Sequence, residues 1–359
     1  MCNGGLHSFL VTLPKCEHHL HIEGTLSPEA LFDLAKRNNI KLSQDDAAFA
    51  SPATLLERYA KFSSLDDFLH YYFKAMEVLL TEPDFETLAM NYFETAKKDG
   101  VVHAEVFFDP DAHTKRGISY ETVVAGLRKG CERAQKELGI SSVLIVCVLR
   151  NHSVSDAKSV LEVAMKAGHF SNGTLGGLGM SGSEKVGKPE DWEEVFTTAK
   201  NAKIHRTAHA GEEGPPEYIS TALGRLHTER IDHGRTLAED PELMKEVATK
   251  QILVTLCPLS NICLRGIKQM SEMPIRKFID AKVHFSINSD DPAYFGGYIL
   301  ANYCSVQEEF NLSLGEWEDI AEHAIQGSWC SAERKRELKN LVYKHSMKFR
   351  SSRPMPARR

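Results

Sequence analysis

The chain has 359 residues, of which 42% are hydrophobic and 26% are charged, and its formal net charge is −6 at pH 7. This composition is ordinary for a chain that buries a core, and it argues against a disordered or fibrous protein. The negative net charge gives no field that would attract nucleic-acid phosphates or anionic lipids, so we expect a small-molecule substrate and neither nucleic acid nor membrane as a partner.

The N-terminal segment and the cysteines indicate an intracellular protein. Residues 1–15 contain no apolar core of the kind that a signal peptide needs, and no long apolar run occurs elsewhere. The eight cysteines are scattered without any Cys-x-x-Cys pair, which favours buried reduced thiols over disulfides or a cysteine metal site. We therefore expect a cytoplasmic protein that could also occur in the nucleus, and the sequence leaves its oligomeric state open.

Short β-branched runs alternate with longer amphipathic segments from residue 100 onward. This alternation is expected of repeated βα units around a parallel sheet. Eight strand candidates can be placed: Lys15–His21, Val101–Phe108, Val143–Leu149, Leu175–Leu178, Ile204–His209, Arg230–His233, Ile252–Leu256 and Val283–Asn288. Because eight strands close a barrel and the length suits one, we predict an α/β fold, a (β/α)8 TIM-type barrel.

Two regions lie outside this alternation. The segment 25–98 has helical patterns but no clear strand, so we expect a helical insertion after strand 1 that covers the barrel mouth as a lid. Ser27 before Pro28 is typical of a helix N-cap and the first helical residue. After the eighth strand we expect extra C-terminal helices. The prediction is one barrel domain over residues 1–347 and a basic, disordered tail over 348–359.

Residues that can bind a metal fall at the ends of several predicted strands. His19 and His21 are two apart on the first strand, so both side chains are expected on one face. Such a pair alone is as often structural, but His209 and Asp290 fall at the carboxyl ends of later strands, which converge in a barrel. Three imidazoles and a carboxylate predict a catalytic metal site, and these ligands would admit iron or manganese as well as zinc.

Three further residues lie where catalytic groups are expected. Glu212 lies just beyond the fifth predicted strand, in a position for general acid/base work. His233 could orient or deprotonate a metal-bound water, and the alternative is a buried histidine bonded to Asp232. Asp291 stands next to Asp290, and adjacent carboxylates repel unless a cation or proton lies between them. Asp291 could bind the substrate, and the alternative is a turn or helix N-cap.

Four motifs together resemble the adenosine/adenine deaminase family of metal-dependent hydrolases. They span nearly the whole chain in the family's order: Leu13–Gly24, Thr207–Glu212, Arg230–Gly234 and Asn288–Pro292. The segment Ser289–Tyr298 is particularly similar to the fungal-type adenine deaminases. The resemblance implies a (β/α)8 barrel that removes the amino group of a 6-aminopurine.

Carried over residue by residue, the resemblance implies one zinc ion per chain on His19, His21, His209 and Asp290. It also implies Glu212 as the proton donor to ring N1, His233 as the group that activates water, and Asp291 as a contact of the purine ring. Zinc lowers the pKa of its water toward neutrality, so that hydroxide can attack the purine C6 at pH 7. With adenine as the substrate, the products would be hypoxanthine and ammonia, as in purine salvage.

The choice of substrate depends on residues beside these motifs. Glu23 stands where family members that bind a ribose often have Asp, and the longer acid is typical of the adenine type because it would crowd a ribose. In fungal adenine deaminases an Asp-Ser pair occupies the positions of Ser181 and Gly182. The shorter side chains here would free backbone N–H groups for a larger purine. We expect adenine first, and adenosine, a nucleotide or an N6-modified purine as alternatives.

Two other functions fit parts of the pattern. Other hydrolases with the same His-x-His opening often have a carbamylated lysine that bridges two metals. The fourth strand region, 174–179, holds no lysine, which favours a mononuclear site even if the reaction is that of another amidohydrolase. A catalytically inactive barrel that binds a purine or a protein partner would need a broken set of residues, and none of the six expected metal ligands and catalytic residues is missing.

Overall fold

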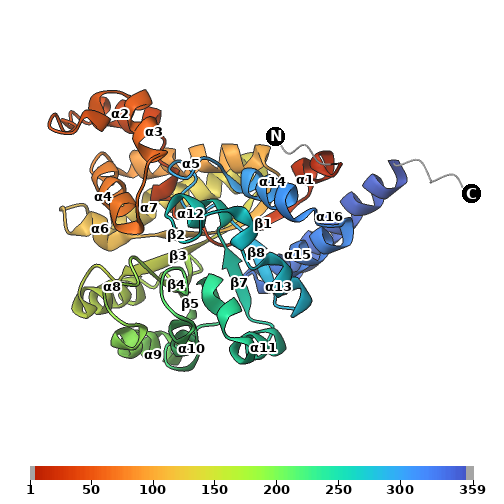
Figure 1. The fold of residues 1–359 in the computed structure, drawn as a ribbon. Coiled ribbons are helices and arrows are strands. Elements are labelled where there is room, and N and C mark those ends of the chain that lie inside the picture. The colour runs from red at the N-terminus through yellow and green to blue at the C-terminus, as the bar shows by residue number, and fades with distance from the viewer. Residues whose placement is uncertain (1–4, 353–359) are drawn as a thin grey trace, which may run out of the picture.

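The computed structural model describes residues 5–352, whose strands form one parallel sheet that curves into a barrel (Figure 1). The sheet follows chain order from the first strand to the eighth. The strands are β1 (Lys15–Glu17), β2 (Val101–Phe108), β3 (Ser141–Leu149), β4 (Leu175–Ser181), β5 (His205–Ala210), β6 (Arg230–His233), β7 (Leu253–Leu256) and β8 (Phe285–Ile287). The predicted (β/α)8 barrel is confirmed.

Helices connect the strands and cover the outside of the barrel. They are α1 (His7–Thr12), α2 (Pro28–Arg37), α3 (Pro52–Tyr59), α4 (Leu65–Met76), α5 (Glu82–Lys98), α6 (Pro110–Thr114), α7 (Tyr120–Arg133), α8 (Val154–Lys166), α9 (Glu193–Asn201), α10 (Pro216–Gly224), α11 (Pro241–Thr249), α12 (Pro258–Cys263), α13 (Ile275–Asp280), α14 (Ile299–Phe310), α15 (Leu314–Gly327) and α16 (Ala332–Ser352). Among residues 5–352, no helix is both long and apolar enough to cross a membrane.

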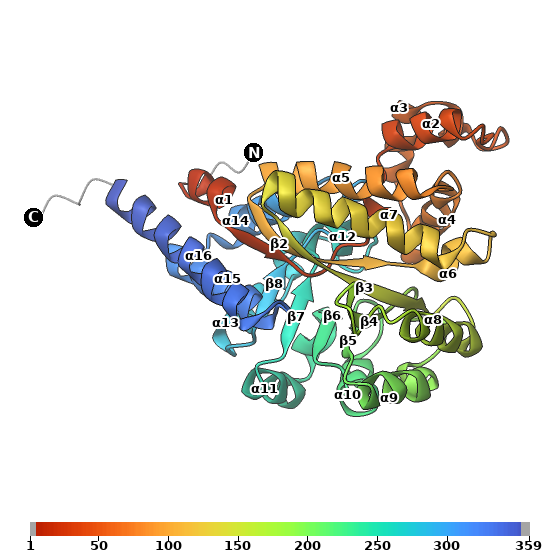
Figure 2. The same ribbon diagram turned by 180° about the vertical axis from the view of Figure 1, so that it is seen from behind.

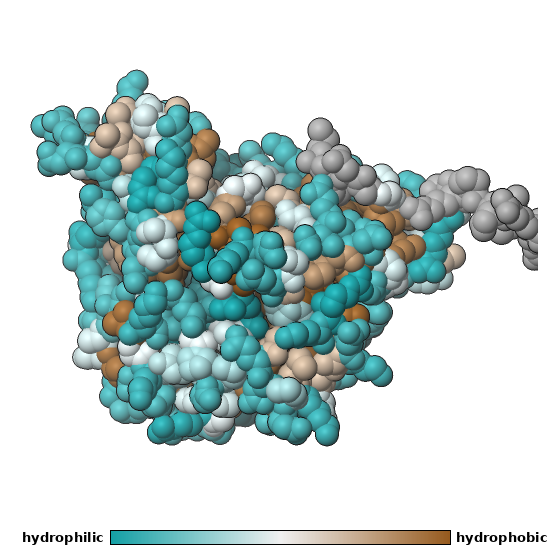
Figure 3. All heavy atoms as spheres, in the orientation of Figure 1, coloured by the Kyte–Doolittle hydropathy of each residue, from teal (hydrophilic) through white to brown (hydrophobic). Residues whose placement is uncertain are grey.

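The strands are apolar because both of their faces are buried. In β3 all six residues from Leu144 to Leu149 are buried between the barrel interior and the helices outside, as is typical of parallel sheets. Outer helices such as α7 turn residues like Val123 and Leu127 toward the strands. The face of the molecule in Figure 3 is mainly hydrophilic, with smaller apolar patches.

The barrel closes between the ends of β1 and β8. The strand β1 ends at Glu17, earlier than predicted, and the following segment makes only isolated bridges, one of them between His21 and Phe107. His21 N donates to the carbonyl of Asp290, and Asp290 N donates to the carbonyl of His19, both at 3.0 Å. The strand predicted over 15–21 is shorter because its second half bonds alternately to two neighbours instead of forming a regular ladder.

The segment between β1 and β2 is helical as predicted, but only its first part lies outside the ring of helices. Helices α2 and α3 project away from the barrel, whereas α5 packs along α7 in the ring (Figures 1 and 2). Ser27 caps α2, since its hydroxyl accepts a hydrogen bond from Ala30 N at 3.2 Å. Of the predicted insertion over 25–98, only the part before α5 can therefore cover the mouth.

The expected C-terminal helices are present as α14, α15 and α16. Helix α16 continues past residue 347, where the barrel domain was predicted to end, because no Gly or Pro interrupts it before its end at Ser352. The first residues of the predicted tail are thus helical. The rest of that tail, residues 353–359, lies outside the described residues.

A buried ion pair crosses the barrel interior from β2 to β6. Arg230 Nη1 donates to Glu105 Oε2 at 2.5 Å, and neither side chain reaches solvent. Burial opposes ionisation of Glu105, but the Arg230 charge holds the pKa of this carboxyl well below its usual range. The guanidinium carbon of Arg230 also lies over the indole ring of Trp329, 4.1 Å from the ring centroid, in a cation–π contact.

Removing this carboxylate should destabilise the barrel. Glu105→Ala removes the nearer of the two carboxylates that face the buried Arg230 charge and leaves only Asp232, 3.8 Å away, so we expect the free energy of unfolding to fall by about 3–5 kcal/mol. Urea unfolding followed by circular dichroism measures the loss. The control is Glu137→Ala, which breaks the surface pair with Arg133 and should move the unfolding midpoint little. A midpoint unchanged in both variants would contradict the role of the buried pair.

Candidate active site

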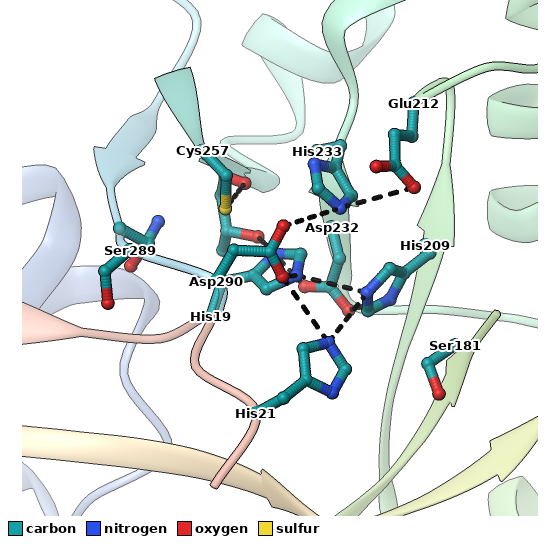
Figure 4. A network of polar contacts seen from close by, with 12 residues as sticks. His19, His21, Ser181, His209, Glu212, Asp232, His233, Cys257, Ser289 and Asp290 are labelled. Atoms are coloured by element: carbon teal, nitrogen blue, oxygen red, sulfur yellow. Dashed lines mark hydrogen bonds and ion pairs between the residues drawn. The ribbon is translucent and has the colours of Figure 1, made fainter. Parts of the chain in front are cut away.

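The four predicted metal ligands meet at the carboxyl ends of the strands. His209 lies on β5, His19 and His21 follow β1, and Asp290 follows β8. The Nε2 atom of His209 lies 3.1 Å from Nε2 of both other histidines. Oδ1 of Asp290 lies 3.3 Å from Nε2 of His19 and 3.6 Å from Nε2 of His21 (Figure 4). All four side chains are buried, so residues from three distant parts of the sequence form one compact group.

This group fits a metal ion better than it fits hydrogen bonds. A neutral imidazole has a single N–H, so three Nε2 atoms that face one another cannot all be paired. Burial lowers the pKa of His209 well below its usual value, which keeps the ring neutral. Metal–nitrogen bonds of about 2.1 Å at tetrahedral angles separate ligand atoms by about 3.4 Å, close to the distances found here. Three imidazoles and one carboxylate suit zinc and other divalent metals.

His233, the last residue of β6, lies beside the same group. Its Nε2 atom is 3.7 Å from Oδ2 of Asp290 and 3.6 Å from Oε2 of Glu212. The ligand atoms of His233, His19, His209 and Asp290 all lie within 4.8 Å of one another. The backbone φ is 61° at His233 and 63° at Asp290. Such left-handed non-glycine residues cost about 1–3 kcal/mol each and cluster at functional sites.

The surroundings shift the pKa values of the carboxyl groups of this site in opposite directions. Burial and the nearby charge of Asp290 raise the pKa of Glu212 well above its usual value, which favours the protonated form of this side chain. Burial also opposes ionisation of Asp290, but His19 and His233 hold its pKa well below the usual range. A neutral acid beside an anionic ligand is the arrangement that general acid catalysis requires.

The loop that carries Glu212 is held by a second carboxylate. Glu184, in the loop after β4, is buried and accepts hydrogen bonds from four successive backbone N–H groups, those of residues 211–214, at 2.7–2.9 Å. Arg150 supports the same region by donating to the carbonyl of His209 at 2.7 Å. Glu184 was not predicted from the sequence, since nothing in the pattern distinguishes it from a solvated loop acid.

A further layer orients the first histidine. Thr255 Oγ1 lies 2.9 Å from Nδ1 of His19 and donates to Asp232 at 3.0 Å. Groups of this kind fix the orientation of a ligating imidazole. Nδ1 of His233 instead lies 3.5 Å from the amide nitrogen of Asn261, so the structure does not pair His233 with Asp232, the alternative considered from the sequence.

A small cavity opens in front of this group. Helix α4 contributes the apolar side chains of Leu65, Phe68 and Leu69 to its wall. The lining residues are His21, Leu65, Phe68, Leu69, Tyr72, Asp109, Leu149, Ser181, Gly182, His209, Glu212, His233, Leu264, Asp290 and Asp291. None of these described lining residues is Lys or Arg, so the wall offers several carboxyl groups and no cationic side chain.

Two of the three residues predicted to contact the substrate line this cavity. Asp291 is buried, and its Oδ1 atom has no hydrogen-bond partner among the described residues. Burial raises the pKa of Asp291 well above its usual value, so this carboxyl can donate a hydrogen bond. Gly24 packs against it, because a Cβ there would lie 2.0 Å from Oδ1 of Asp291. Gly182 has a φ of 89°, which favours glycine. The third residue, Glu23, does not line the cavity.

Glu23 lies behind the wall and supports a residue that the sequence analysis missed. Its Oε1 atom accepts a hydrogen bond from the backbone N–H of Asp109 at 3.1 Å and lies 3.0 Å from Nε2 of His113. Asp109 lines the cavity, where its carboxylate accepts from the Tyr72 hydroxyl at 3.0 Å and from the Ser181 hydroxyl at 3.2 Å. Its position directly after the second predicted strand was the signal that could have identified it.

A parallel (β/α)8 barrel with a buried histidine and aspartate cluster at the carboxyl ends of its strands defines the class of metal-dependent barrel hydrolases. Within this class, the adenosine deaminase family profile matches residues 14–345. The chain belongs to the adenosine deaminase family.

Three similar proteins show how far the likeness extends. The adenine deaminase of Aspergillus fumigatus is 54% identical over 351 residues, which cover 97% of this chain and 99% of the relative. The crystal structure of adenine deaminase from Arthrobacter aurescens has a TM-score of 0.88 at 38% identity and covers 93% of this chain and 99% of its own. A zinc-containing amidohydrolase from Burkholderia ambifaria has a TM-score of 0.87 at 25% identity, with coverage of 98% and 97%.

The ligand assignment predicts how metal content responds to substitution. His209→Ala removes the imidazole that faces both other histidines, so we expect the bound metal per chain to be lost. Glu212→Gln is the matched control, since this side chain lies beside the ligands and should leave metal content unchanged. Elemental analysis by mass spectrometry of both purified variants measures the difference. Full metal content in His209→Ala would exclude the assignment.

Proposed function

We propose that this protein hydrolyses adenine to hypoxanthine and ammonia, with one zinc ion per chain. The observation that carries the proposal is the buried Glu212 carboxyl, 3.6 Å from His233 and beside a cluster of histidines and an aspartate in a small cavity. Adenine as the substrate is supported by the relative of that name, which is 54% identical over nearly the full length. Zinc is supported by the donor set and by the zinc-containing Burkholderia ambifaria neighbour.

The residues around the reacting carbon divide the work. Zinc, when bound by His19, His21, His209 and Asp290, supplies a water of lowered pKa. Glu212 donates its proton to the purine N1, which draws electrons from C6 and allows that carbon to become tetrahedral. His233 orients the attacking water and accepts its proton. The bond from the water oxygen to C6 forms, His233 passes the water proton to the amino nitrogen, and the bond from C6 to that nitrogen breaks to release ammonia. The second water proton leaves the C6 hydroxyl and returns to Glu212 as the carbonyl of hypoxanthine forms.

Asp291 holds the imidazole ring of the substrate. Adenine carries an unprotonated nitrogen, N7, on the edge next to the amino group. The protonated Asp291 carboxyl can donate to this nitrogen, because burial keeps its pKa high. Since Oδ1 of Asp291 has no partner among the described residues, the side chain is available for this bond.

The alternative substrates are less well matched by the cavity. A nucleotide phosphate requires a cationic partner, and the described lining residues include none. The Ser181 hydroxyl is bonded to Asp109, so the short residues at 181 and 182 add no phosphate site. Adenosine and N6-modified purines are compared directly in the assay below. Location in the cytoplasm or nucleus, and a role in purine salvage, stay predictions from the sequence.

The first test compares possible substrates. We expect the metal-loaded protein to deaminate adenine with a higher kcat/KM than adenosine, AMP or N6-methyladenine, followed by the change in ultraviolet absorbance. A chelator should abolish the activity, and added zinc should restore it. Silence on adenine with turnover of one of the other purines would overturn the substrate assignment.

The second test concerns the proton donor and its support. Glu212→Gln removes the acidic proton and should lower kcat on adenine by at least about 100-fold. Glu184→Gln replaces one of the carboxylate oxygens that bind the backbone N–H groups of residues 211–214 with an N–H donor, which should displace the loop that carries Glu212. We expect this displacement to lower kcat by about 10- to 100-fold with little change in KM. Glu213→Gln, beside Glu212 but outside the cavity, is the matched control. Full activity of Glu212→Gln would disprove the mechanism.

A further inference from the structure

One carboxylate of the cavity wall has no part in the mechanism described above. Asp109 is 1% exposed and follows β2, whereas the proposed metal ligands lie on β5 or follow β1 and β8. Its two oxygens each accept one side-chain hydroxyl, from Tyr72 and Ser181. A carboxylate has about four acceptor sites, so Asp109 can accept further hydrogen bonds.

The surroundings hold Asp109 in one orientation. The Tyr72 hydroxyl fixes Oδ2, the Ser181 hydroxyl fixes Oδ1, and Glu23 binds the backbone N–H from behind. No Lys or Arg side chain lies among the described residues of the cavity wall to neutralise it. An acceptor that is rigid, buried and unpaired with a cation is suited to a ligand that donates a hydrogen bond.

The position of Asp109 places it near the far edge of a bound purine. The edge with N1 and the amino group must face Glu212 and the metal ligands for the reaction to occur. In Figure 4, Ser181 lies on the opposite side of His209 from Glu212. Because Ser181 is bonded to Asp109, this acid belongs to the same part of the wall. The imidazole edge of the purine, with its N9–H, points toward that part.

We propose that Asp109 accepts a hydrogen bond from N9–H of the free base and thereby selects bases over N9-substituted purines. The inference rests on the proposed function, because it assumes that the amino group of the purine faces Glu212. A nucleoside has no N–H at this position and would leave the buried carboxylate without its bond. Sites built to bind an N–H or O–H reject analogues that lack it by factors of about 10⁴–10⁵.

A purely structural role for Asp109 makes a different prediction. If the carboxylate only tied Tyr72 to Ser181, its replacement would affect every purine equally, because the shape of the cavity would change for all of them. A recognition role affects only substrates that carry the N9–H. The ratio of kcat/KM for adenine to kcat/KM for an N9-substituted purine therefore separates the recognition role from the structural role. A change in stability alone does not separate them.

The experiment measures kcat/KM for adenine and 9-methyladenine in the wild type, Asp109→Asn and Asp111→Asn. The wild type should prefer adenine strongly. Asp109→Asn should lower kcat/KM for adenine by about 10- to 100-fold, which corresponds to one hydrogen bond to a charged group. Because 9-methyladenine does not make this bond, the ratio of kcat/KM for adenine to kcat/KM for 9-methyladenine should fall by a similar factor. Asp111→Asn is the matched control, since Asp111 pairs with Lys115 and His152 outside the cavity. It should keep the wild-type ratio.

Metal content and the midpoint of thermal unfolding are measured for each variant. If Asp109→Asn does not fold, Tyr72→Phe takes its place, because it removes one of the hydrogen bonds that orient Asp109. This variant should also lower the ratio of kcat/KM for adenine to kcat/KM for 9-methyladenine. Equal losses on both substrates, or no loss, would overturn the inference while adenine deamination by the wild type stands. A wild type that does not act on adenine would instead contradict the proposed function itself.

Discussion

Closure of the barrel between β1 and β8 is the constraint on which the site depends. The backbone bonds that close it are made by His19, His21 and Asp290, which are also three of the four proposed metal ligands. Their side chains meet because their main chains are already paired. The closure is reinforced by Asn288, whose side chain accepts from the backbone of His18, 270 residues earlier in the chain. A metal bound here would therefore join the two ends of the sheet and would be expected to stabilise the fold.

The chemistry of the site follows from how burial acts on neighbouring carboxyl groups. Glu212, Asp290 and Asp291 are all buried, yet only the pKa of Asp290 is lowered, because imidazoles surround it. Burial raises the pKa of the other two carboxyl groups, and the charge of Asp290 raises it further, which favours their protonated forms. In the proposed mechanism, these two groups donate to N1 and N7 of the purine. Burial and one neighbouring anion thus act on both groups in the same direction.

The barrel could be predicted from the sequence, and the grouping of the candidate metal ligands with it, because both follow local rules. Strand periodicity marks the sheet, and residues at strand ends converge, so His209 and Asp290 could be brought together without a structure. The length of β1 was not predictable, since its later residues are bonded by segments far away in the chain. Glu184 and Asp109 were missed for a similar reason: their roles depend on partners in other loops, and an acid in a loop is ordinarily solvated.

Glu23 illustrates how a correct clue can have a different physical basis. Its length suggested that it would crowd a ribose directly. In the structure its side chain lies behind the cavity wall, where it bonds to the backbone of Asp109 and to His113. It therefore supports the wall and does not line the space in which a substrate would bind. An aspartate at this position would be shorter by one methylene and would not reach as far. The longer side chain can therefore favour a free base by holding Asp109 in place, and discrimination at this end of the cavity would then depend on hydrogen bonding more than on lack of space.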